Sequence, residues 1–192
     1  RERSINPEHP VLRGSAENGD IFFQHREACN TYYDAFPAIV EEYMDKINAR
    51  LGTDYIDLGM IHYVDDEADW NNVVNTPFLQ YVLQLKEKGV IRHIGMSTHN
   101  PVIAKLAVES GLVEMILFSI NPAFDMMPAT ENITDYYATE YDPALAGIDP
   151  QRAELYRLCE SRDVGITVMK GFAGGRLFDE KRSPFGVTLT PL

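Results

Sequence analysis

The stretches DYIDLGMIH at 54–62 and VIRHIGM at 90–96 decide the fold. Both are rich in β-branched and apolar residues, which is typical of strands buried on both faces of a parallel sheet. Two further strands are expected at 112–120 and 165–169. Between the strands, a capping residue followed by proline marks the start of each helix. These starts are Thr76–Pro77, Asn100–Pro101 and Asp149–Pro150. The alternation predicts a parallel α/β architecture.

The rest of the chain contains one further helix and two irregular segments. Apolar residues at i, i+4 and i+8 predict a helix over 35–51. Residues 1–33 are polar and irregular, apart from a short strand expected at 20–24, and 122–148 form a long acidic and aromatic loop. We therefore divide the chain into an irregular N-terminal segment, 1–33, and a partial β/α barrel, 34–192.

Two architectures accept this alternation, an open doubly wound sheet and a closed barrel. A doubly wound dinucleotide fold needs a G-x-G-x-x-G turn, and the spacing of Gly171, Gly174 and Gly175 does not match it. Polar residues end each strand instead, and a barrel carries its functional side chains at the carboxyl ends of its strands. Those residues are His62, Ser97, Thr98, His99, Asn100, Ser119, Asn121 and Lys170. The barrel is the better fit.

The length bears on how much of a barrel is present. A (β/α)8 TIM barrel takes about 250 residues, whereas this chain has 192 residues and four convincing strands. We expect it to supply about four to five central β/α units. Further segments or a second chain would complete the barrel and cover the open strand edges.

Composition narrows the classes of partner. The chain has 29 acidic and 17 basic residues, a net charge of −12, which disfavours nucleic acid and anionic membrane surfaces. No apolar run approaches the roughly 20 residues of a membrane-spanning helix. The two cysteines, Cys29 and Cys159, lack metal-ligand spacing. We expect a cytoplasmic protein.

His62 is the main candidate for chemistry, because it ends an apolar strand. Its near-neutral pKa suits donating or relaying a proton. It could instead bind a metal with Asp65 or Glu67, or be a buried structural histidine. Tyr63 is expected on the opposite face of the strand from His62, so it is not assigned a role.

Ser97, Asn100, Lys170 and the nearby glycines are candidates for binding a ligand. A hydroxyl or amide after a strand can hydrogen-bond an amide-bearing ligand, and a helix N-terminus favours anions. Asn100 is equally explained as a helix cap, and Lys170 as a solvated charge. The isolated histidines His25, His93 and His99 are expected to be structural or exposed.

Together these motifs resemble the aldo-keto reductase family. LGTDYID at 51–57 with MIH at 60–62, and GVIRHIGMS at 89–97, are similar to two of its signatures. Asn121–Pro122 matches a third in part. MKGFAGG at 169–175 resembles the MKPLAGG turn of a bacterial and archaeal branch. The resemblance covers about residues 38 to 180.

The resemblance implies a barrel that binds NADP(H) or NAD(H) without a Rossmann domain and passes hydride to a carbonyl. A tyrosine gives the proton, assisted by lysine, aspartate and histidine. His62 matches that catalytic histidine, and Ser97 matches the residue that holds the nicotinamide carboxamide. The remaining implied cofactor contacts are Thr98, Asn100, Asn121, Met169, Lys170, Gly171 and Gly174.

The chain also departs from the family pattern. No D-x-A-x-x-Y stretch with the aspartate and tyrosine precedes residue 38, and His25 stands where the lysine is expected. Leu117 replaces a glutamine that touches the carboxamide, and the motif for the adenosine 2′-phosphate is missing. Members of this branch often carry an iron–sulfur segment, so a [4Fe-4S] cluster would lie in a C-terminal segment outside this chain.

The sequence thus predicts NAD(P)H-dependent reduction of a small aldehyde or ketone, or the reverse reaction, without a metal ion. This describes the parent protein, and the chain alone is expected to lack the tyrosine donor. Two alternatives stay open. One is a metal-dependent β/α-barrel hydrolase, and the other is a non-catalytic binding protein derived from a reductase.

Overall fold

The computed structural model of the chain describes residues 49, 52–137 and 144–189. It divides into two compact units, which we describe separately. One comprises 1–55 and 71–90, and the other comprises 56–70 and 91–192. The helix predicted over 35–51 and the segment 1–33 with its strand at 20–24 lie outside the described residues, except for residue 49.

In the first unit, α4 (Pro77–Glu87) begins where the sequence predicts. The Thr76 hydroxyl accepts the Phe78 N–H at 3.3 Å, and Pro77 occupies the first helical turn. Phe78 and Val82 are buried, as the apolar stripe predicts. The helix ends at a turn in which Gly89 adopts φ 73°.

The second unit contains a four-stranded parallel sheet. Its strands are β1 (Ile56–Ile61), β2 (Ile91–Thr98), β3 (Met115–Ser119) and β4 (Gly165–Met169), in the order β1-β2-β3-β4. Each strand pairs with the next one along the chain, so the order has no reversal of the kind that defines a doubly wound fold. Sequential order is that of a barrel segment, and the α/β class and partial barrel are confirmed.

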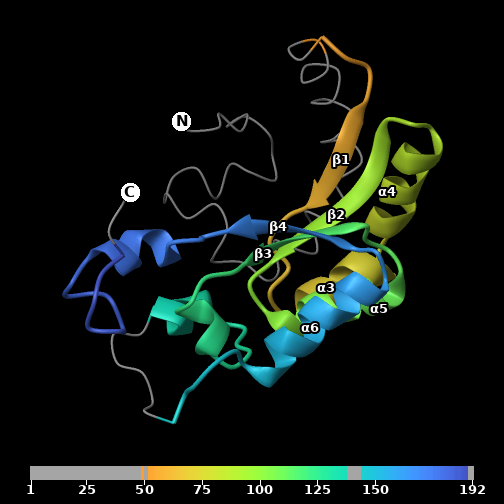
Figure 1. Ribbon diagram of the computed structural model, residues 1–192. Coiled ribbons are helices and arrows are strands. Elements are labelled where there is room, and N and C mark those ends of the chain that lie inside the picture. Colours follow the sequence, from red (N-terminus) through yellow and green to blue (C-terminus); the bar gives the residue numbers. More distant parts are fainter. Residues whose placement is uncertain (1–48, 50–51, 138–143, 190–192) are drawn as a thin grey trace, which may run out of the picture. The chain divides into compact units, whose positions relative to one another are not determined.

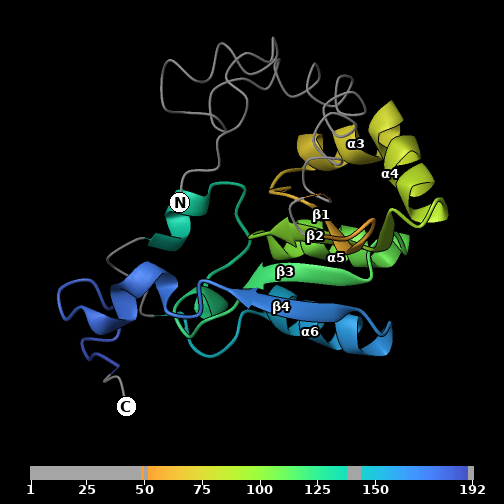
Figure 2. The ribbon, with the colours of Figure 1, turned by 90° about the horizontal axis from the view of Figure 1, so that it is seen from above.

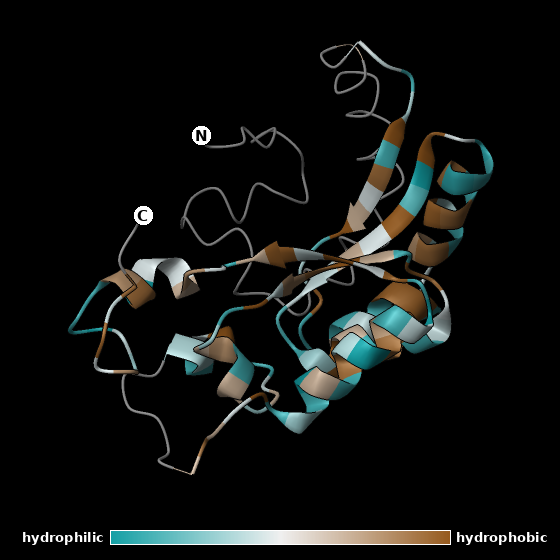
Figure 3. Ribbon diagram, viewed as in Figure 1, coloured by the Kyte–Doolittle hydropathy of each residue, from teal (hydrophilic) through white to brown (hydrophobic). Residues whose placement is uncertain are grey.

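Two helices cover one face of this sheet. These are α5 (Pro101–Ser110) and α6 (Pro150–Ser161), which pack on each other along the same face (Figures 1 and 2). The alternate residues Ile94, Met96 and Ile116 turn toward the helices and are buried. In Figure 3 the strands carry brown segments among paler and teal ones, and teal segments lie on the visible side of α6. The sheet's core therefore lies on its helical face.

Asparagine and aspartate cap the two covering helices as predicted. The Asn100 side chain accepts the Val102 N–H at 3.0 Å, and Asp149 accepts the Gln151 N–H at 2.9 Å. Gly111 ends α5 in the left-handed conformation, φ 72°. All three features follow from local backbone chemistry.

The acidic segment after β1 contains a helix that was not predicted from the sequence. α3 spans Glu67–Asn75 and crosses the boundary between the units. The Asp66 carboxylate accepts the Asp69 N–H at 2.7 Å at its start. Carboxylates in a first helical turn also interact favourably with the helix dipole.

The long loop predicted at 122–148 is also partly ordered. It contains two 3-10 helices, η1 (Phe124–Met126) and η2 (Ile133–Tyr137), and a third, η3 (Ala173–Phe178), follows β4. Phe124 stacks on Tyr136 with ring centroids 5.2 Å apart. With Ala173 and Leu177 they form a second small core.

Candidate functional site

The carboxyl ends of β1 and β2 bring His62 and Ser97 into contact. The parallel register pairs Ile61 with Met96, so the next residues along both strands are neighbours. Ser97 Oγ lies 2.8 Å from His62 Nδ1. His62 is exposed and Ser97 is buried. An imidazole at the end of a barrel-type strand, exposed and oriented by a buried hydroxyl, is suited to meeting a substrate oxygen.

Tyr63 turns the chain directly after β1. Its φ of 63° is in the left-handed region, which costs a non-glycine residue about 1–3 kcal/mol. Its backbone N–H donates to Ser97 Oγ at 2.7 Å, and the next N–H, of Val64, donates to the Ser97 carbonyl at 3.0 Å. The strand has already ended, so the rule of alternating faces does not apply to Tyr63.

The Tyr63 ring lies beside two histidines, with centroids 6.3 Å from His62 and 5.7 Å from His99. Burial, followed by the charges of Asp65, Asp69 and Asp66, raises the pKa of Tyr63 to about 12. The phenol therefore keeps its proton firmly, so it is suited to hydrogen bonding and unsuited to releasing the proton.

Asp65 organises a buried network below this contact. Its carboxylate accepts the Thr98 hydroxyl at 2.9 Å and the His99 backbone N–H at 2.6 Å, and lies 2.8 Å from His99 Nδ1. The Asn100 amide donates to the Asp65 carbonyl at 3.0 Å. Asp65 is buried, and the network ties the loop after β1 to the loop after β2. Sequence reasoning considered Asp65 only as a metal ligand and His99 only as structural or exposed.

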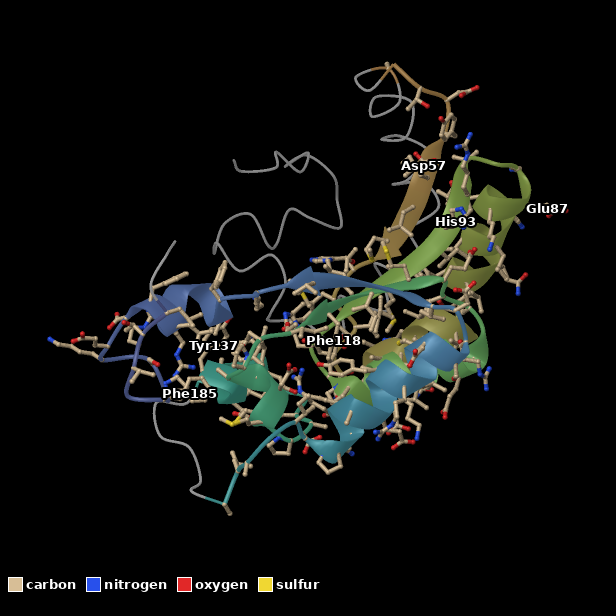
Figure 4. The ribbon with its side chains drawn as sticks, viewed as in Figure 1. Asp57, Glu87, His93, Phe118, Tyr137 and Phe185 are labelled. Carbon is tan, nitrogen blue, oxygen red and sulfur yellow. The ribbon has the colours of Figure 1, made fainter. Side chains whose placement is uncertain are left out.

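Thr98 and Asn100 are thus already engaged by the fold. The Thr98 hydroxyl also accepts the Asn100 N–H at 3.1 Å, and the Asn100 carbonyl oxygen caps α5. Their role as cofactor contacts stays a prediction. His93, by contrast, is exposed, lies 2.7 Å from Glu114, and sits on the part of β2 far from its carboxyl end (Figure 4).

A second group of predicted residues lies at the carboxyl ends of β3 and β4. The Asn121 amide donates to the Lys170 carbonyl at 3.0 Å, and its oxygen accepts the N–H groups of Ala123 and Phe124. Asn121 therefore fastens β4 to η1. Its role as a cofactor contact also stays a prediction.

The turn after β4 has an unusual backbone. Lys170 and Ala173 have φ values of 53° and 49°, and Gly174 and Gly175 have 65° and 86°. A Cβ added to Gly171 would meet no heavy atom within 4 Å, so this turn has open space beside it. Lys170 supplies a cation there, and half-buried Met169 precedes it.

The same edge has a cavity of about 580 Å³. Its lining is mainly apolar and includes Ile148 and Phe185, while Asn121, Gly171 and Asp125 connect it to the strand ends. Figure 4 shows Phe185 and Tyr137 beyond the carboxyl ends of β3 and β4. His62 and Ser97 do not line this cavity, so the predicted site residues form two groups.

Arg152 is a buried charge that sequence reasoning missed. Its Nη1 donates to the Ser119 carbonyl at 2.9 Å and lies 3.3 Å from Asp125, which also accepts the Tyr156 hydroxyl at 2.7 Å. Its guanidinium lies over the Tyr136 ring at 5.1 Å. Burial raises the pKa of Asp125, although Tyr156 and Arg152 oppose it. An arginine in the first turn of a predicted helix carries no local sign of burial.

The remaining features to describe are candidate metal ligands and membrane-spanning helices. Within the described ranges, no group of three or more histidine, cysteine, aspartate or glutamate side chains is placed to hold a metal ion. The Asp65 carboxylate, which the metal-hydrolase alternative would use, is engaged by Thr98 and His99. Of the helices in the same ranges, none is both long and apolar enough to cross a bilayer.

The model of the Aldo/keto reductase family matches residues 31–188, which is most of the chain. This range contains the four strands and both groups of site residues.

Curated relatives match shorter stretches. A pyruvate-flavodoxin oxidoreductase from Enterobacter agglomerans is 53% identical over 55 residues, 29% of this chain and 5% of that protein. One from Rhodospirillum rubrum is 50% identical over 64 residues, 33% of this chain and 5% of that protein. The chain spans about 5% of the length of these relatives.

Solved structures with a similar chain path are aldo-keto reductases. The holo form from Bacillus halodurans shares 23% identity with a TM-score of 0.46, covering 74% of this chain and 38% of that one. An enzyme from Brucella melitensis shares 21% with a TM-score of 0.44, over 74% and 44%. A silkworm (Bombyx mori) enzyme complexed with NADPH shares 17% with a TM-score of 0.42, over 70% and 35%.

Proposed function

The chain belongs to the aldo/keto reductase family, and from that premise we propose that it is part of an NAD(P)H-dependent oxidoreductase acting on a small aldehyde or ketone. The contact between His62 and Ser97 carries the proposal. It places an exposed imidazole at the carboxyl end of β1, where enzymes of barrel architecture place their reacting groups.

The residues of the turn after β4 suit a bound nucleotide. The turn at Lys170–Gly175 fits a pyrophosphate, because it has open space at Gly171 and a cation at Lys170. Gly174, with φ 65°, keeps the backbone of this turn in a left-handed path. Met169 offers a polarisable surface against which a nicotinamide ring can pack.

For the carboxamide of the nicotinamide ring, the chain has fewer polar groups that can form hydrogen bonds. Ser97 retains capacity for one more hydrogen bond, since a hydroxyl has one donor and two acceptor sites. Thr98, Asn100 and Asn121 shape the site through the contacts described above. We therefore assign Ser97, Met169, Lys170, Gly171 and Gly174 to the nucleotide and give the other three a supporting role.

When bound, the nucleotide supplies or accepts the hydride. The chain's own contribution is His62, whose imidazole donates a hydrogen bond to the carbonyl oxygen and draws charge onto it. Burial is the largest cause raising the pKa of Tyr63, Tyr136 and Tyr156. Burial disfavours the phenolate that proton donation would leave, so none of the three is proposed as the proton donor.

Cys159 bears on the cellular compartment in which we propose the protein lies. It is a buried free thiol, and burial raises its pKa to about 11. Free thiols of this kind are typical of reducing compartments. We place the protein in the cytoplasm on this ground.

The test combines binding and turnover. Fluorescence titration of the purified chain with NADPH and with NADH measures binding, and the loss of nucleotide absorbance with a panel of aldehydes and ketones measures turnover. We expect the chain to bind one nucleotide saturably. We expect the full-length protein, which would supply the tyrosine donor, to show turnover that His62→Ala reduces at least about 100-fold.

His93→Ala is the matched control, because it removes an imidazole from the same sheet outside the strand-end site. It should keep full turnover. Saturable binding without turnover would overturn the enzymatic proposal in favour of a binding protein, and absence of nucleotide binding would overturn it altogether.

A further inference from the structure

Ser97 occupies a position that links the backbone after β1 to the candidate catalytic imidazole. We propose that Ser97 is a positioning residue that fixes the tautomer of His62, holding the ring proton on Nε2. The inference rests on the proposed function for its role in catalysis, although the tautomer itself can be measured without any activity.

A count of hydrogens supports this assignment. The Tyr63 backbone N–H can only donate, so at 2.7 Å it takes one acceptor site of Ser97 Oγ. The hydroxyl's own hydrogen then needs an acceptor, because Ser97 is only 2% exposed. In the described part of the chain, the hydrogen-bonding group that remains within reach of Oγ is His62 Nδ1, at 2.8 Å.

The tautomer follows from this bond. If the Ser97 hydroxyl donates to Nδ1, that nitrogen is an acceptor and carries no proton. A neutral imidazole then carries its hydrogen on Nε2. The opposite arrangement, with Nδ1–H donating to Oγ, would leave a buried hydroxyl hydrogen without an acceptor. Leaving a buried donor unpaired costs about 1–3 kcal/mol.

The backbone holds Ser97 in place for this task. The Val64 N–H donates to the Ser97 carbonyl at 3.0 Å, and the β1–β2 register continues to Ile61 and Met96 directly before it. The left-handed φ of 63° at Tyr63 aims its N–H at the hydroxyl. The backbone directly after β1 therefore holds both the main chain and the hydroxyl of Ser97.

The consequence concerns the proposed reaction. Nε2–H is the group that can donate to a carbonyl oxygen, whereas the other tautomer would present a lone pair to it. A histidine held in the wrong tautomer loses most of its catalytic effect in serine proteases. His62 is exposed, and the Ser97 contact at Nδ1 helps to fix the orientation of its ring.

The first experiment measures the tautomer directly. The full chain, with histidine labelled by ¹⁵N, is recorded by long-range ¹H–¹⁵N correlation at a pH where its imidazoles are neutral. The chain has five histidines, and His62→Gln identifies the signals of His62. We expect Nδ1 to be of the unprotonated type and Nε2 of the protonated type. A protonated Nδ1 in the wild-type chain overturns the proposal, whatever happens to any variant.

The second experiment removes the hydroxyl. Ser97→Ala should shift His62 toward a mixture of tautomers, and Ser97→Thr, which keeps a hydroxyl, should restore the wild-type pattern. Ser161→Ala is the control, because that serine donates to a helix carbonyl at 2.9 Å away from the site. A wild-type tautomer in folded Ser97→Ala would overturn the proposal.

Kinetics separate positioning from cofactor contact. We expect kcat to fall about fivefold to tenfold in Ser97→Ala, which corresponds to the loss of one hydrogen bond. A serine that only contacted the nucleotide would raise KM for the nucleotide and leave kcat and the tautomer unchanged, which would contradict us. If the full-length protein shows no turnover at all, the proposed function fails while the NMR result still decides the tautomer.

Discussion

Replacing Asp65 with alanine tests whether the buried network at the ends of β1 and β2 stabilises the fold. The Asp65 side chain is 6% exposed and is contacted by three donors, one from Thr98 and two from His99. Alanine leaves these donors buried and unpaired, at about 1–3 kcal/mol each. The costs are not additive because the donors share one partner. With three buried donors left without their acceptor, we expect the free energy of unfolding to fall by about 3 kcal/mol or more.

The assay is urea unfolding followed by tryptophan fluorescence. Trp70 is the single tryptophan of the chain and is 8% exposed, so its emission reports loss of the surrounding packing. Asp57→Ala is the matched control, because that carboxylate is exposed and pairs with Arg92 at 2.8 Å. Exposed pairs contribute about 0–1 kcal/mol. If Asp65→Ala destabilises the chain no more than Asp57→Ala, the network does not carry the stability assigned to it.

Three further predictions follow from single residues. Gly95→Ala should lower the free energy of unfolding by about 1–3 kcal/mol, because its Cβ would lie 3.2 Å from a backbone carbonyl oxygen. Gly165→Ala, whose Cβ would have its nearest atom at 3.5 Å, should change this free energy by less than about 0.5 kcal/mol. Urea titration of both variants measures the two changes. Burial raises the pKa of the Cys159 thiol to about 11, so in a Cys29→Ser background it should resist a disulfide reagent at neutral pH until denaturant is added. Rapid labelling of the native chain would contradict this. Burial and nearby aspartates raise the pKa of Tyr63 from 10.0 to about 12. The contribution of Tyr63 to the stability of the folded chain is therefore present below pH 10 and is lost as the pH rises to about 12. Tyr63→Phe should flatten that decline in the unfolding midpoint, and an unchanged decline would refute the assignment.

The helix starts could be predicted because they depend on local chemistry. Thr76, Asn100 and Asp149 cap the helices that the sequence assigns to them. Proline after each cap fixes the first helical φ, so neighbours in the chain are sufficient information. The parallel direction of the strands also follows from the alternation, since parallel neighbours need a crossover helix.

Some elements were not predicted from the sequence. No helix is predicted at Glu67–Asn75, although Asp66 is an ordinary capping residue for it. The 3-10 helices η1 and η2 have no period of their own. Their order comes from packing between Phe124 and Tyr136, which no local pattern contains.

For the candidate site, the sequence predicts the positions of the main residues but not all of their contacts. Motifs along the chain place His62 and Ser97 at the ends of strands, and the register brings them together. The pairing of Asp65 with His99 joins residues 34 positions apart, so it requires the folded loops. Sequence spacing also could not separate polar groups that hold the fold, such as Asn121, from an exposed group such as His62.

The residues directly after β1 and β4 adopt left-handed backbone conformations. Tyr63 and Lys170 both adopt positive φ without being glycine, at a cost of about 1–3 kcal/mol each. At both places the backbone offsets this strain with hydrogen bonds, from the Tyr63 N–H to Ser97 Oγ and from Asn121 and Ala173 to the Lys170 carbonyl. Glycine would adopt the same turns without that cost. The side chains at these positions therefore contribute something the turn does not need, and both stand beside groups that we propose bind a ligand.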